Sequence, residues 1–94
     1  MQENTTNDKY RDILINSINK IHTTKMGAER ISENLNINED PVEYCKTKIQ
    51  KKESEITRKG KNYYVDIDEC IITVNASSYT IITAHKKSIK TNKI

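Results

Sequence analysis

The apolar residues of this chain change their spacing near residue 55, and this change constrains the fold more than any other feature. Before it, apolar residues recur every three or four positions, as on one side of an α-helix. After it, they alternate with polar residues, as in a half-buried β-strand. Helices therefore come first and strands second, which predicts the α+β class.

Three helices are predicted, at about 8–21, 25–35 and 41–52. In the second, Met26, Ile31 and Leu35 share one side and are expected to point inward. Asp40 and Pro41 give the clearest start signal in the chain. Asp caps helix N-termini, and Pro suits the first helical position.

Four strands follow, at about 55–59, 62–67, 70–76 and 79–85, with two-residue loops assumed between them. With loops of that length, one face of the sheet is mostly apolar and includes Ile81, Thr83 and His85 of the last strand. The other face is polar and includes Tyr64, Ile82 and Ala84. The prediction is three N-terminal helices packed on one face of a four-stranded antiparallel β-meander. One domain spans residues 1–87, and a basic tail occupies 88–94.

Charge is distributed unevenly along the 94 residues. Residues 1–45 contain five Lys/Arg against eight Asp/Glu, whereas residues 46–94 contain eleven against five. A basic half of this kind is typical of proteins that meet phosphate or an acidic partner, so RNA or an acidic protein is the expected partner class. The competing explanation is that the basic residues only keep the protein soluble and contact no partner.

Several functional classes are disfavoured. The chain contains two Cys and two His without metal-site spacing, and only two Gly, so neither a metal centre nor a Gly-rich phosphate loop is expected. It contains no apolar run of the ~20 residues that a membrane span needs, and no export signal. We therefore expect a cytoplasmic protein with reduced thiols, no cofactor and no membrane association.

Two segments resemble a known family. They are Ile21–Ile31 (IHTTKMGAERI) and Arg58–Lys86 (RKGKNYYVDIDECIITVNASSYTIITAHK). Together they resemble a family of short bacterial proteins defined as a domain of unknown function, and the likeness covers most of residues 10–87. The resemblance implies an architecture and a bacterial or phage origin, but no activity.

The predicted order of elements is also similar to that of the barnase–EndoU–colicin–RelE ribonucleases, which cut RNA without metal. In such an enzyme His85 would act as the general acid or base, with Arg58 stabilising charge and Tyr64 contacting the RNA. Three lysines would bind phosphate: Lys59, Lys61 and Lys86. The competing interpretation is structural: His85 would only close the rim of the apolar sheet face, and the turn lysines would only contact solvent.

Two further patterns bear on function. Thr24, Lys25 and Arg30 lie at a helix start, where free backbone N–H groups attract phosphate, although Thr is also an ordinary N-cap. Residues 31–52 have the apolar spacing of a helix-turn-helix, but the second helix opens with acidic residues that would oppose DNA. Three functions follow as hypotheses: an RNA-directed module of the ribonuclease type, a non-catalytic module binding protein or nucleic acid, and DNA binding through 31–52.

Overall fold

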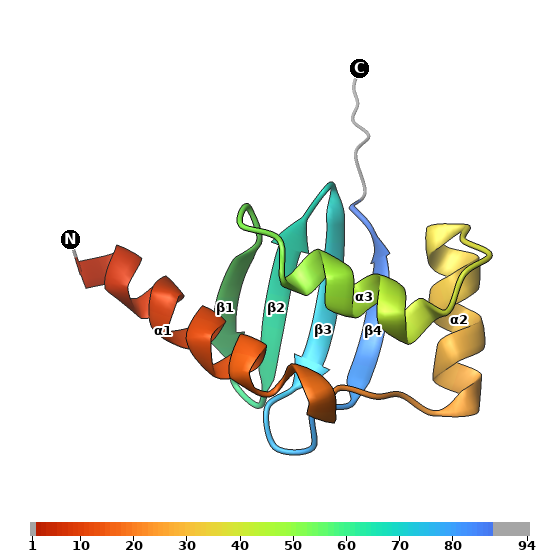
Figure 1. Ribbon diagram of the computed structural model, residues 1–94, viewed down its shortest axis with the longest axis horizontal. Coiled ribbons are helices and arrows are strands. Elements are labelled where there is room, and N and C mark those ends of the chain that lie inside the picture. The colour runs from red at the N-terminus through yellow and green to blue at the C-terminus, as the bar shows by residue number, and fades with distance from the viewer. Residues whose placement is uncertain (1, 88–94) are drawn as a thin grey trace.

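The computed structural model describes residues 2–87, with side chains from residue 9 onward. Helices precede strands (Figure 1), and the predicted α+β class is confirmed. The helical elements are α1 (Gln2–Asn16), the 3₁₀ helix η1 (Ile18–Lys20), α2 (Lys25–Leu35) and α3 (Pro41–Ile49). The antiparallel sheet has the order β1-β2-β3-β4, with β1 (Glu55–Lys59), β2 (Asn62–Ile67), β3 (Cys70–Asn75) and β4 (Ile81–Lys86). The predicted basic tail at 88–94 lies outside the described residues.

Two helices differ from their predicted bounds. α1 begins at Gln2 instead of residue 8 and ends at Asn16 instead of residue 21. η1 turns the chain after α1, and Ile21 then has extended backbone angles (φ −69°, ψ 131°). α3 ends at Ile49 rather than at residue 52. The Ser54 hydroxyl donates a 2.9 Å hydrogen bond to the carbonyl of Ile49. This side chain satisfies a carbonyl that the helix end leaves without an intrahelical partner.

The starts of α2 and α3 follow the predicted capping chemistry. Thr24 accepts a 2.9 Å hydrogen bond from the backbone N–H of Gly27. The Asp40 carboxylate accepts from the backbone N–H groups of Val42 and Glu43, with Pro41 at the first helical position. Each cap pairs a backbone donor that would otherwise lack a partner.

The first two hairpins have tight two-residue turns. Gly60 in the first has φ 61°, a left-handed conformation that glycine adopts without strain. Asp68 and Glu69 in the second have φ 50° and 63°, the pattern that matches the twist of antiparallel strands. These turns give the predicted register, with Tyr63 and Val65 on one face and Tyr64 on the other.

The predicted faces of the last strand are wrong from Thr83 onward. The β3–β4 connection covers residues 76–80 instead of two residues, and the register shifts so that Val74 pairs with Ile81 but Thr73 pairs with Thr83. Ile82 is therefore the extra residue of a β-bulge. Consequently Ala84 is buried on the apolar face, while Thr83 and His85 lie on the opposite one.

The helices cover one face of the sheet. α1 and α3 lie across the same side of the sheet, whereas α2 lies beside β4 at its edge (Figure 1). The side-chain amide of Asn34 in α2 donates to the Ala84 carbonyl at 3.3 Å, so α2 occupies part of the hydrogen-bonding edge of β4. Among the described residues, fifteen buried hydrophobic side chains form the core between helices and sheet, including Leu14, Ile31, Cys45, Ile49, Ile56, Val65, Ile72, Val74 and Ile81.

Candidate functional site

The uncovered side of the sheet, called here the open sheet face, gathers several of the predicted site residues. Within residues 2–87 no helix lies across this side (Figure 1). Tyr64 lies near its middle, half-exposed, and pairs with Thr57 on one side and Thr73 on the other. The face as a whole carries Glu55, Thr57, Lys59, Asn62, Tyr64, Asp66, Ile71, Thr73, Asn75, Ile82, Thr83 and His85.

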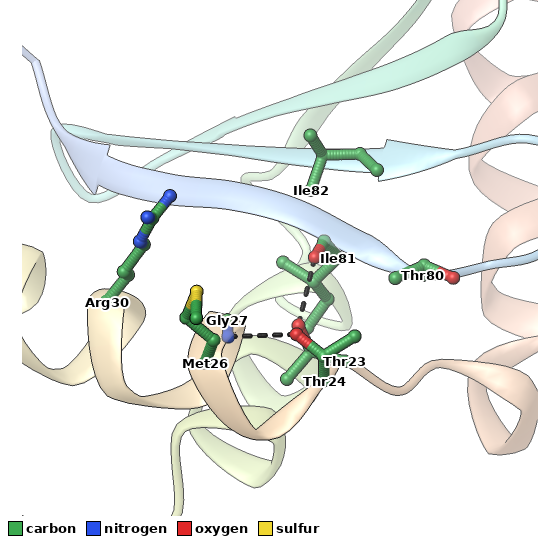
Figure 2. A pocket seen from close by; sticks show the side chains of 8 residues that line it. All are labelled: Thr23, Thr24, Met26, Gly27, Arg30, Thr80, Ile81 and Ile82. Carbon is green, nitrogen blue, oxygen red and sulfur yellow. Dashed lines mark hydrogen bonds between the residues drawn. The ribbon is translucent and has the colours of Figure 1, made fainter.

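Three predicted phosphate-binding cations lie toward one end of the molecule. Lys59 closes β1 and Lys61 lies in the following turn, both exposed. Antiparallel pairing places the end of β1 at the same end of the sheet as the end of β3 and the start of β4. α2 begins at this same end (Figure 1), and Lys25 is its first residue. We call this set, Lys25, Lys59 and Lys61, the basic end, whereas Arg30 lies further along α2, beside β4 (Figure 2).

His85 lies at the other end of the open sheet face. It shares a row with Ile71, Asp66 and Glu55, and its Nδ1 is 3.0 Å from the Lys86 carbonyl oxygen. Three strand spacings of about 4.8 Å separate it from β1, and four residues along β1 add about 13 Å more before Lys59 is reached. Lys86 pairs with Cys70 and so belongs to the helix-covered side. The structure therefore does not bring His85 or Lys86 together with Lys59 and Lys61.

Arg58 lies on the opposite side of the sheet from Tyr64 and His85. It pairs with Tyr63, and its guanidinium carbon lies 5.3 Å from the centroid of the Tyr63 ring. Its Nε donates a 3.0 Å hydrogen bond to the carbonyl of Gly60. Arg58 therefore stacks on the rim of the core and holds the β1–β2 turn. The predicted catalytic set of His85, Arg58 and Tyr64 does not share one site.

Lys48 of α3 and Lys51, which follows the end of this helix, are engaged within the fold. Both donate to the same oxygen of Asp68, at 2.7 and 2.8 Å. These two hydrogen bonds lower the pKa of Asp68, and the bond that Lys48 donates to Asp68 raises the pKa of Lys48. In the predicted helix-turn-helix this helix would carry the DNA-reading side chains. Here it lies across the sheet with Cys45 and Ile49 buried, and its Lys48, together with Lys51 beyond its end, holds the β2–β3 turn.

The segment between η1 and α2 joins the helical part to the edge of β4. The backbone of His22 makes two hydrogen bonds to the chain at the start of β4. Its carbonyl accepts from the Ile81 N–H at 2.7 Å, and its N–H donates to the Tyr79 carbonyl at 3.2 Å. The hydroxyl of Thr23 donates to the Ile81 carbonyl at 3.0 Å. A Cβ at Gly27 would overlap this hydroxyl oxygen, so the glycine permits the close approach.

A pocket of about 240 Å³ opens where this segment meets β4 (Figure 2). We call it the α2–β4 pocket, and its lining consists of Thr23, Thr24, Met26, Gly27, Arg30, Thr80, Ile81 and Ile82. The inward orientation predicted for Met26 is wrong, because its side chain is 62% exposed. No sequence signal marked the pocket as a unit, since its two halves lie about fifty residues apart in the chain.

Metal and membrane features are sparse in the part of the chain that the structure describes. No group of three or more His, Cys, Asp or Glu residues there is placed to hold a metal ion. None of the described helices is both long and apolar enough to cross a membrane.

Comparisons with known proteins place the chain in a family. Neither the curated proteins nor the solved structures give a significant match, so the similarity to ribonucleases rests on the order of elements alone. A match to a protein family spans residues 15–85 and so includes η1, α2, α3 and the sheet up to His85. The chain belongs to the family described as "Protein of unknown function (DUF3781)".

Proposed function

We propose that this protein is a cytoplasmic module that binds single-stranded RNA across the basic end of its open sheet face. The observation that carries the proposal is the position of Tyr64, half-exposed near the middle of an uncovered sheet, with Lys59 and Lys61 at the near end. Sheets of this kind bind unpaired bases by stacking them on aromatic rings while cations track the phosphates.

The neighbouring side chains suit RNA. Thr57 and Asn62 lie next to Tyr64, and Thr83 lies two strands away on the same face; their hydroxyl and amide groups can pair with base edges and with the 2′-hydroxyl. The carboxylate of Asp66 lies toward the His85 end, where the ammonium of Lys87 pairs with it at 2.9 Å. The negative charge nearest Tyr64 on this face is thereby partly neutralised.

The proposal is for binding without cleavage. A general acid must lie within hydrogen-bond reach of the leaving oxygen. His85 lies about 20 Å from Lys59 by strand geometry, so a phosphate held at the basic end is out of its reach.

Replacing Tyr64 by Ala is expected to weaken the binding of a fluorescein-labelled single-stranded RNA about tenfold, because stacking of one base on an aromatic ring contributes about 1–3 kcal/mol. Tyr64→Phe keeps the ring and should bind nearly as the wild type does. Fluorescence anisotropy in EDTA measures both, and gels of the same samples check that the RNA stays intact. Cleavage of the RNA would contradict the binding module. Absence of binding by the wild type would reject RNA and turn the search to an acidic protein partner.

Replacing Lys59 by Gln is expected to reduce the salt dependence of binding. Each phosphate contact on a single strand contributes about 0.7 to the slope of log K against log salt concentration. We expect the slope to fall by roughly that amount in Lys59→Gln, whereas Lys52→Gln, an equally exposed lysine after α3, should leave it unchanged. Equal slopes in the two variants would place the phosphates elsewhere.

A further inference from the structure

The α2–β4 pocket carries both of the large hydrophobic side chains that are most exposed among the described residues. Met26 is 62% exposed and Ile82 is 53% exposed, and they line the same cavity from α2 and from β4 (Figure 2). Ile82 is exposed because it is the extra residue of the bulge, which directs a side chain out of the regular ladder. Paired exposed apolar side chains around a cavity mark a binding site more often than isolated ones do.

The charge and size of the pocket restrict its ligand. Arg30 is the one charged residue in the lining, and the Arg30 side chain extends from α2 toward β4 (Figure 2). A volume of about 240 Å³ is below the roughly 300–1,000 Å³ of sites for drug-sized molecules, so the pocket suits one flat ring rather than an extended molecule. The guanidinium group can stack on such a ring or pair with a phosphate beside it.

The pocket is continuous with the proposed RNA surface. Ile81 is buried, and the Ile82 side chain lies on the other side of the β4 ribbon (Figure 2), so Ile82 lies on the side of the sheet that carries Tyr64. Two strand spacings, about 10 Å, separate β2 from β4. A stacked single strand rises about 3.4 Å per nucleotide, so about three nucleotides connect the two positions.

We propose that the α2–β4 pocket receives one base of a single-stranded RNA, about three nucleotides from a base stacked on Tyr64. This inference rests on the proposed function and adds a second subsite to it. Met26 and Ile82 contact the inserted base, and Arg30 contacts its phosphate or its edge. The sheet then binds the strand at two points, which fixes its path across the basic end.

The test uses RNA octamers that carry a single 2-aminopurine at successive positions, together with Met26→Glu and Met26→Leu. Because Met26 is largely exposed, both variants are expected to fold like the wild type. We expect one 2-aminopurine position to change its emission strongly on binding. Met26→Glu should abolish that change and weaken binding about tenfold, the effect of losing one stacked base, while Met26→Leu retains both.

The inference and the proposed function fail in different ways. Wild-type affinity in Met26→Glu, with an unchanged 2-aminopurine signal, would overturn the pocket while leaving RNA binding on Tyr64 intact. A wild type that binds no single-stranded RNA would overturn both. Sedimentation velocity adds one more outcome: a dimer that Met26→Glu dissociates, with RNA affinity unaltered, would make the pocket a contact between two copies and reject the base subsite.

Discussion

Replacing Arg11 by Met is expected to destabilise the protein by about 2–4 kcal/mol. Hydrogen bonds from a charged group contribute roughly 1.5–3 kcal/mol each, and the Arg11 side chain, which makes three of them, is partly exposed to solvent. Arg11 in α1 donates to the carbonyl of Ser54 at 2.6 Å, to the hydroxyl of Ser54 at 2.9 Å and to the carbonyl of Lys51. Ser54 is only 5% exposed, so water cannot readily replace the lost donor.

The location of these bonds explains the size of the effect. They connect α1 to the turn between α3 and β1, and they place a positive charge where α3 ends, which its dipole favours. The Ser54 hydroxyl that accepts from Arg11 also caps Ile49. Removing Arg11 therefore loosens α1, the end of α3 and the entry into β1 together.

Thermal denaturation followed by circular dichroism measures the loss, and 1 kcal/mol corresponds to about 4–8 °C in a domain of this size. We expect Arg11→Met to lower the Tm by at least about 8 °C. Lys9→Met is the matched control, since it removes the same charge from an exposed position of the same helix and should change stability by less than about 0.5 kcal/mol. Equal Tm values for the two variants would show that the bonds contribute nothing.

Arg11 also illustrates what could not be predicted from the sequence. The spacing of apolar residues was sufficient to predict the fold class. Short turns and capping residues added the first two hairpins and the starts of α2 and α3, because these depend on local sequence. Nothing local connects Arg11 to Ser54, which lies 43 residues away. Contacts between side chains far apart in the sequence depend on how the helices and strands pack in the folded protein.

The faces of β4 failed for a different reason. Alternation along a strand predicts the side of the sheet on which each side chain lies only if every residue pairs in turn with the neighbouring strand. The bulge at Ile82 breaks that condition. The prediction therefore placed His85 and Thr83 on the helix-covered side of the sheet and left Ala84 out of the core. It also obscured the candidate site, because the pocket depends on the bulged residue and on an α2 that lies beside the sheet.

Raising the pH above 9 is expected to destabilise the protein through Cys45. Burial, and to a lesser extent the neighbouring Cys70 thiol, raises the pKa of Cys45 from 9.0 to about 12. The folded protein thus keeps the thiol protonated where the unfolded chain would release its proton. Stability from this group is complete below pH 9 and is lost as the pH rises toward 12, at about 1.4 kcal/mol per pH unit.

Between pH 8.5 and pH 11 this effect amounts to about 2–3 kcal/mol, which makes it one of the largest single-group contributions expected in a domain of this size. Tyrosines and lysines also titrate in this range, so the wild type must be compared with Cys45→Val, which fills most of the same space without an ionisable group. Urea denaturation at both pH values gives the two free energies of unfolding. The wild type should lose about 2–3 kcal/mol more than the variant between these pH values. Parallel losses would mean that the Cys45 thiol ionises as readily in the folded protein as in the unfolded chain, which the complete burial of this α3 side chain opposes.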